Sequence, residues 1–364
     1  TVAATGTNGA KDIGPGQNGT VSGANTFTGG SIGLGATSAF YTPSNTTAQV
    51  FCASLTGFEP GSEVTINGLP DSFGANDIVA DADGCIHLWL PNGTHIFEAN
   101  GRECTVTIQD GVVPTGVTVN GQEIATAPAV PGAGWAYDAA NRTLALTGAG
   151  PFTLSGTNVV GGVCVIVSGD VVNPVTLANL TLRMTGGSQC AFMLGTGANV
   201  SLVLAGTNAL ASGYNCAGIQ VESGRTLSIT NAPGDDAAAL SVTGGRNAAG
   251  IGGGNSVNGG TVNILGGIVT AAGGNGASGI GGGFKGAGGT VSIAGGTVFA
   301  QGGNYASGIG GGGEKAGGGV TISGGRIAAL GGSRGAGIGG GSYDGTGGAG
   351  GAVTISGGTV FAQG

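Results

Sequence analysis

Hydrophobic and polar residues alternate in short runs, separated by glycines, through the C-terminal third of the chain. One unit reads Thr290-Val291-Ser292-Ile293, then a Gly-Gly turn, then Thr297-Val298-Phe299-Ala300, then a segment ending in Gly-Ile-Gly-Gly-Gly. Alternation with a period of two predicts strands that bury one side only. Each unit therefore predicts three short strands, which cannot form a core without neighbouring units.

The Gly-Ile-Gly-Gly-Gly motif recurs at a constant spacing. Its isoleucines, from Ile251 to Ile338, follow one another at intervals of 29 residues, and upstream Val167, Met193 and Ile219 continue the column at intervals of 26. A repeat of this length with strand-like alternation predicts a parallel β-helix, in which stacked coils bury a continuous apolar column. The predicted core ladder is Ile219, Ile251, Ile280, Ile309 and Ile338.

Two different patterns precede the repeats. Residues 47–112 hold four alternating runs typical of a small β-sandwich, and residues 1–46 are rich in Gly, Thr and Asn. The first segment is either a flexible leader or an arm shaped to pair with a solenoid strand, because part of it echoes a coil. The expected fold is all-β: an extended N-terminal arm (1–46), a small Ig-like or prealbumin-like β-sandwich domain (47–112) and a parallel β-solenoid with coils of about 29 residues (113–364).

Composition restricts the partners and the compartment. Glycine supplies 86 of 364 residues, and charged residues make up 8%, against about 25% in typical soluble domains. No basic patch is visible, and no apolar run approaches the length of a membrane span, so neither nucleic acid binding nor membrane insertion is expected. The chain begins at Thr1 like a processed chain, and its six cysteines form no CxxC pair. These features favour an extracellular or cell-surface location.

The cysteines divide into two groups. Cys164, Cys190 and Cys216 follow one another at intervals of 26 residues, which predicts one stacked column. They act either as small buried residues or as rungs of which one is oxidised, because neighbouring strands lie within disulfide reach. In the sandwich, Cys52 and Cys104 occupy the first and last predicted strands and are the favoured disulfide candidates.

The repeats carry few groups that could run a reaction. Solenoid enzymes that cleave polysaccharides need clustered carboxylates on one face. The adjacent acids Asp235 and Asp236 lie in a loop insertion, and the charged residues of the later coils form no ladder. We therefore expect no enzymatic activity, no cofactor and no metal site.

Several motifs are similar to those of a known group of proteins. They are Gly134-Trp135-Ala136-Tyr137-Asp138, Ala217-Gly218-Ile219-Gln220-Val221 and the Gly-Ile-Gly-Gly-Gly repeats. Through them the chain from about residue 115 onward resembles large Gly-rich β-helix repeat surface proteins of anaerobic, often gut, bacteria, usually labelled carbohydrate-binding-domain proteins. Leu90-Pro91-Asn92-Gly93-Thr94 is similar to a hairpin of small surface-protein sandwich modules. The resemblance implies a glycan ligand but carries over no binding residues.

The last repeat ends after its second strand with no polar cap, although solenoids normally have one. Either the chain is a fragment of a longer repeat protein, or another subunit completes the end. The leading hypothesis is a structural subunit of an extracellular fibre or surface layer that assembles head-to-tail with copies of itself. The assembly candidates are Val21, Phe27, Ile32, Val360 and Phe361.

The alternative hypothesis is a cell-surface adhesin or carbohydrate-binding module. Its support is a set of aromatic residues expected to point outward and to stack on sugars, namely Phe299, Tyr305, Tyr343 and Phe361.

Overall fold

A computed structural model describes residues 187–364 without a break, and residues 115–184 apart from 126–132, 159–161 and 170. Of the first 114 residues it describes the strands given below and a few residues beside them. The described chain consists of strands and turns without a helix, as expected for an all-β fold. It divides into two compact units, one mainly of residues 1–115 and one of residues from Gly116 onward.

The N-terminal unit contains two four-stranded sheets, in the orders β10-β9-β6-β7 and β2-β5-β8-β4. Buried Leu90 and Phe97 come from one strand of each sheet. A further parallel pair joins β1 to β3. The strands are β1 (Val2–Ala4), β2 (Asn25–Thr26), β3 (Ile32–Leu34), β4 (Phe40–Tyr41), β5 (Gln49–Thr56), β6 (Glu63–Asn67), β7 (Ile78–Val79), β8 (Cys85–Pro91), β9 (Gly93–Ala99) and β10 (Arg102–Ile108).

Part of the predicted arm belongs to these sheets. Strand β2 pairs with β5, and strand β4 pairs with β8, although both fall within residues 1–46. Each of these strands has two residues, too few to show the alternation by which the sandwich strands were predicted.

The solenoid begins with antiparallel strands that cover its first coil. Strand β13 (Trp135–Asp138) pairs antiparallel with β14 (Thr143–Leu146), and β11 (Val117–Val119) pairs with β12 (Gln122–Glu123) and β15 (Phe152–Thr157). Trp135 and Tyr137 pack partly buried against the core. The first parallel pairs join β14 to β16 (Cys164–Val167) and β15 to β17 (Val175–Arg183).

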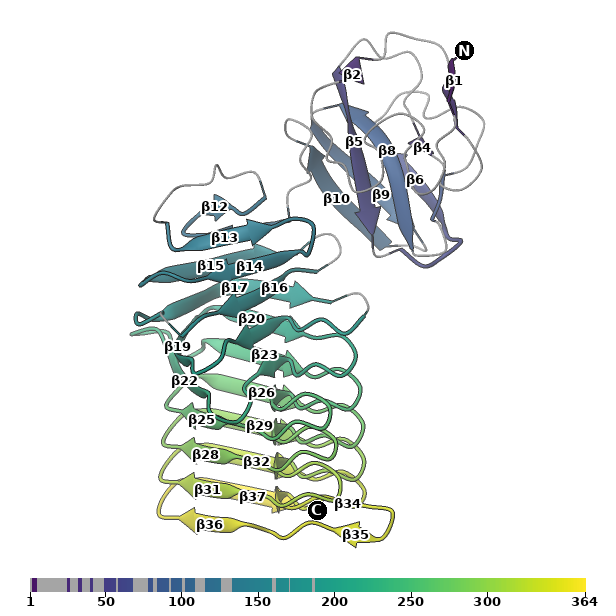
Figure 1. The fold of residues 1–364 in the computed structure, drawn as a ribbon. Coiled ribbons are helices and arrows are strands. Elements are labelled where there is room, and N and C mark those ends of the chain that lie inside the picture. Colours follow the sequence, from purple (N-terminus) through teal and green to yellow (C-terminus); the bar gives the residue numbers. More distant parts are fainter. Residues whose placement is uncertain are drawn as a thin grey trace. The chain divides into compact units, whose positions relative to one another are not determined.

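From β17 onward each coil contributes one strand to each of three faces (Figure 1). The first face is β19 (Asn199–Ala205), β22 (Thr226–Asn231), β25 (Thr261–Ile264), β28 (Thr290–Ile293), β31 (Gly319–Ile322) and β36 (Ala352–Ile355). The second face is β20 (Thr207–Ala211), β23 (Ala239–Thr243), β26 (Ile268–Ala272), β29 (Thr297–Gln301), β32 (Arg326–Leu330) and β37 (Thr359–Gln363). The third face is β18 (Phe192–Leu194), β21 (Ile219–Gln220), β24 (Ile251–Gly252), β27 (Ile280–Gly281), β30 (Ile309–Gly310) and β33 (Ile338–Gly339). The predicted parallel β-solenoid with 29-residue coils is confirmed.

The isoleucine column runs along the third face. The register pairs Ile219 with Ile251 and continues through Ile280 and Ile309 to Ile338. The first four of these side chains are fully buried.

The upstream continuation of this column differs from the prediction. Ile219 pairs with Phe192, and Phe192 pairs with Val165, at intervals of 27 residues rather than 26. A spacing of 26 therefore slips by one residue per coil. Because side chains alternate between the two sides of a strand, the slip assigns outward-facing Met193 to the core.

Insertions lie in turns, and the strands stay in register around them. The four additional residues of the last full coil form an antiparallel hairpin of β34 (Ser342–Tyr343) and β35 (Thr346–Gly347). The earlier insertion after β22 forms a turn in which the Asp235 carboxylate accepts a hydrogen bond from the Gly206 amide at 2.8 Å. These turns project beside the stack and leave its core unchanged.

Candidate functional surfaces

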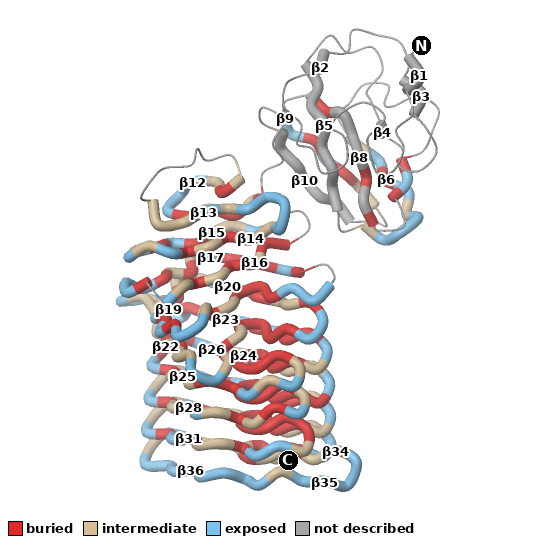
Figure 2. Tube along the Cα trace, viewed as in Figure 1, coloured by how far each residue is buried: buried red, intermediate tan, exposed pale blue. Residues whose placement is uncertain are grey.

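The last coil exposes side chains that every earlier coil buries (Figure 2). Val353 and Ile355 of β36 are 44% and 53% exposed, whereas Val320 and Ile322, their register partners in β31, are 2% and 0% exposed. Val360 of β37 continues the buried column of Ile327 and is partly buried. This surface combines an apolar cross-section of the core with a strand edge.

The predicted assembly residues are only partly described. Val360 faces the core and Phe361 faces outward, so these two neighbours belong to different surfaces. Ile32 lies in β3 and pairs with Val2. Val21 and Phe27 lie outside the described residues.

The outer side of the second face carries the same row of residues twice. Strands β29 and β37 both read Thr-Val-Phe-Ala-Gln, with Thr, Phe and Gln pointing outward. Phe299 is 36% exposed and Phe361 is 56% exposed. Strand β32 lies between them, and its Ala328 pairs with both phenylalanines. The two rows are therefore two strand spacings apart, about 10 Å.

A second group of aromatic residues packs at the turn that follows the third face. Tyr343, on the β34–β35 hairpin, meets the rings of Phe284 and Tyr305 edge to face, with centroid distances of 5.2 and 5.0 Å. Lys285 lies over the Phe284 ring and Arg334 over the Tyr305 ring. The ring faces thus have partners within the protein, so Tyr305 and Tyr343 do not form the free sugar platform predicted for them.

Cys164, Cys190 and Cys216 cluster without forming one column. Because Phe192 pairs with Val165 and with Ile219, the residue beside Cys164 is Ala191, and the residue beside Cys190 is Ala217. Each cysteine is displaced by one position from the cysteine of the neighbouring coil, for the same reason that the 26-residue spacing misplaced Met193. The thiols still meet, since Cys190 and Cys216 share a hydrogen bond.

The thiols belong to a polar network at the surface of the third face. The Cys190 thiol donates to Gln220 Oε1 at 3.0 Å, Gln220 Nε2 donates to Glu222 at 2.7 Å, and Glu222 pairs with Arg225. The hydrogen bond with Cys216, together with burial, raises the pKa of Cys190, and the same bond lowers the pKa of Cys216. Burial raises the pKa of Cys164 to about 11. All three are free thiols.

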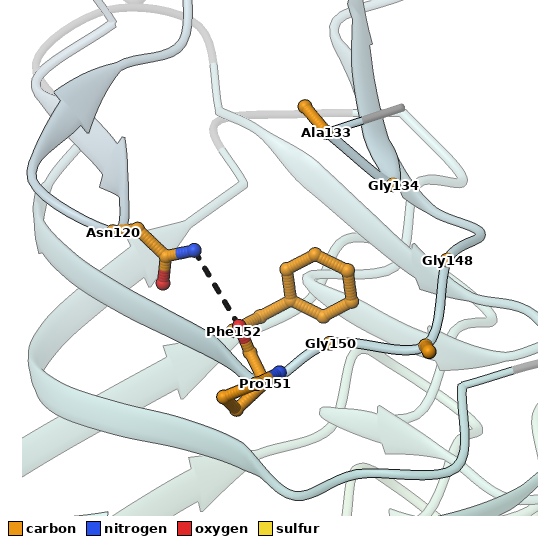
Figure 3. A pocket seen from close by; sticks show the side chains of 8 residues that line it. Asn120, Ala133, Gly134, Gly148, Gly150, Pro151 and Phe152 are labelled. Atoms are coloured by element: carbon orange, nitrogen blue, oxygen red, sulfur yellow. Dashed lines mark hydrogen bonds between the residues drawn. The ribbon is translucent and has the colours of Figure 1, made fainter. Parts of the chain in front are cut away.

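A hollow of about 510 Å³ lies at the N-terminal end of the solenoid (Figure 3). Asn120 spans its wall, since its side chain donates to the Pro151 carbonyl at 3.4 Å and accepts from the Thr153 amide at 2.8 Å. None of its described lining residues carries an ionisable or nucleophilic side chain, so the hollow offers no group for catalysis. They are Asn120, Ala133, Gly134, Gly148, Ala149, Gly150, Pro151 and Phe152.

The sandwich cysteines Cys52 and Cys104 lie on β5 and β10, in different sheets of the N-terminal unit, and their side chains fall outside the described part. Among the residues that the structure describes, no group of three or more His, Cys, Asp and Glu side chains is arranged to hold a metal ion. The same residues include no helix with the length and apolarity needed to cross a membrane.

Comparison with protein-family models, curated proteins and solved structures finds no match to this chain.

Proposed function

We propose that this protein is a non-catalytic β-solenoid module, displayed outside the cell, that binds a neutral, extended polysaccharide along its second face. The observation that carries the proposal is the repetition of one outward Thr-Phe-Gln row in alternate coils, at β29 and β37.

The chemistry of each row suits a sugar. An aromatic ring packs on the apolar face of a pyranose ring, while amide and hydroxyl groups exchange hydrogen bonds with sugar hydroxyls. Among the outward positions of β29, β32 and β37, only Arg326 is charged. A nearly neutral surface of rings, amides and hydroxyls favours a neutral polysaccharide over an acidic one.

The spacing of the rows suits a regular polymer. Coils advance by about 4.8 Å, which is comparable to the advance per sugar along an extended β-1,4-linked chain. Such a chain turns over at each linkage, so every second sugar presents the same face. The rows likewise recur at every second coil, and small Ala328 between the rings leaves room for the intervening sugar.

Co-sedimentation with insoluble cellulose and chitin tests the proposal, with acidic polygalacturonate as the comparison polymer. We expect binding to a neutral polymer that ionic strength leaves unchanged, because charges contribute little. The double variant F299A/F361A should bind at least tenfold more weakly, which corresponds to about 1.4 kcal/mol.

The matched control is Tyr214→Ala, which removes an aromatic ring that is 57% exposed in the turn before β21, away from the second face. It should bind like the wild type. Absence of binding to either neutral polymer, or equal loss in the control, would contradict the proposal.

A second function is favoured by the uncovered apolar surface of β36 and β37. A further coil there would bury Val353 and Ile355 as Val320 and Ile322 are buried, a gain of about 1 kcal/mol or more for each side chain. We propose that a second copy of the chain supplies this contact. Contacts of this head-to-tail kind propagate in a line, as a fibre or surface layer requires.

Sedimentation velocity and electron microscopy over a range of concentrations test this association. The double variant V353K/I355K should remain monomeric, because it places charges on the contact surface. The control Thr354→Lys lies between them and points to the opposite side of β36, so it should associate like the wild type. A wild type that stays monomeric at every concentration would exclude the contact.

A further inference from the structure

Cys190 and Cys216 hold two thiols together on consecutive coils. The register of Phe192 with Ile219 places Cys190 beside Ala217, one residue from Cys216. Neighbouring strands lie about 4.8 Å apart, and disulfides join residues whose Cα atoms are about 4.4–6.8 Å apart. The two thiols already share a hydrogen bond, so joining them requires little movement of the backbone.

We propose that Cys190 and Cys216 form a reversible disulfide that links these two coils, with a low-molecular-weight disulfide as the oxidant. The Cys216 thiolate attacks one sulfur of the oxidant, forms a mixed disulfide and releases one thiolate. The Cys190 thiol then gives its proton to solvent, and its sulfur attacks the Cys216 sulfur and displaces the second thiolate. In sum, two cysteine thiols are oxidised to one disulfide, and the oxidant is reduced to two thiols.

The surroundings assign these roles. The lowered pKa of Cys216 favours its thiolate as the attacking group, and Cys190, whose proton is held more tightly, completes the exchange. Cys216 also lies in the surface turn that follows exposed Tyr214. The proposal does not depend on polysaccharide binding, since these residues lie on the third face and its turns.

Cys164 provides the matched control. It stands beside Ala191, and burial raises its pKa to about 11, so its thiol stays protonated at neutral pH. The disulfide would tie together coils in a fold where each coil contacts only its neighbours. It would do so just before the interval along the third face widens, between Ile219 and Ile251.

Peptide mapping of the full chain tests the proposal. The protein is incubated with oxidised glutathione, remaining thiols are blocked with N-ethylmaleimide in denaturant, and the chain is digested without reduction. Trypsin cannot separate the pair, because residues 184–224 contain no Lys or Arg, whereas chymotrypsin cleaves between them after Phe192 and Tyr214. We expect a Cys190–Cys216 cross-linked peptide, with Cys164 blocked by maleimide.

The variants extend the test. C164S should retain the cross-linked peptide, and C190S and C216S should each abolish it. The oxidised wild type should also unfold at a higher guanidinium concentration than the reduced wild type, because the cross-link restricts the unfolded chain. Recovery of both cysteines as maleimide adducts, or a link from either one to Cys164 or to another chain, would overturn the proposal; the wild-type map decides this even where a serine variant fails to fold.

Discussion

At the third face, the space available to one Cβ atom decides which residue fits. Gly281 has a φ of +135°, and a Cβ there would collide with the carbonyl oxygen of Gly310 in the next coil. Gly252 meets Gly281 in the same way, and Gly310 meets Gly339. The glycines after the isoleucines are therefore needed for the coils to approach at strand spacing as well as for their left-handed φ values.

Replacing Gly281 by alanine should destabilise the protein by about 3 kcal/mol, from the collision and the strained backbone together. The control is Gly319→Ala, because Gly319 has open space around its Cβ position and lies in strand β31. That change should raise stability by about 0.5–1 kcal/mol, since glycine is unfavourable inside a strand. Guanidinium unfolding midpoints measure both effects, and equal midpoints for the two variants would contradict this account.

The reactivity of Cys164 should follow its pKa of about 11. Below that value the thiol is protonated, so alkylation of the native protein should speed up about tenfold per pH unit towards pH 11. The raised pKa stabilises the fold fully below pH 9, the ordinary value of the thiol, and this contribution is lost as the pH rises towards 11. Alkylation followed by mass spectrometry checks the profile, with the unfolded chain as the control that levels off near pH 9.

At the scale of the strand, the register determines what each side chain contributes. Ile293, Ile322 and Ile355 occupy one column of the first face, yet Ile293 is fully buried and Ile355 is half exposed. The same residue type therefore has different surroundings in successive coils, and the difference comes only from whether another coil packs on it.

Ile293→Ala should cost about 2–5 kcal/mol, the range for removing a large aliphatic side chain from a packed core. Ile355→Ala should cost under about 1 kcal/mol, because little packing is lost at the last coil. Denaturant unfolding of the two variants measures the difference. A large loss in Ile355→Ala would mean that this surface is covered in solution.

The regular coils could be predicted from the sequence because their motifs are nearly identical. Ile251, Ile280, Ile309 and Ile338 fix the register without any knowledge of the fold. Upstream the prediction failed by one residue, since Phe192 occupies the isoleucine position and no motif marks it.

Contacts between coils were harder to predict than the coils themselves. The outward direction of Phe299 and Phe361 follows from strand alternation. The burial of Tyr343 against Phe284 does not, because a hairpin inserted two coils later brings these rings together. The hydrogen bond between Cys190 and Cys216 likewise depends on a register that the sequence spacing missed.

For the whole molecule, stability accumulates from contacts between neighbouring coils. Residues 290–318 make up one coil, with β28, β29 and β30, and Gly289 and Gly318 at its borders share the same φ of +74°. Removing them joins equivalent positions and restores every pairing between the coils on either side.

The variant without residues 290–318 should fold, with an unchanged circular dichroism signal per residue and a lower unfolding midpoint. The control removes residues 290–303, about half a coil, and should fail to fold, because later strands would then meet the wrong faces. Size-exclusion chromatography and circular dichroism distinguish the two results. Failure of the whole-coil deletion would mean that this coil has a role its neighbours cannot replace.

The glycine-built third face also limits how this protein can diverge. A side chain added at Gly252, Gly281 or Gly310 collides with the next coil, so natural variation there is removed before it can acquire a use. Heritable change in what the molecule recognises is therefore confined to the outward positions of the other two faces and to the turns. Among descendants of this chain, the third face should stay constant while the row of Thr297, Phe299 and Gln301 drifts.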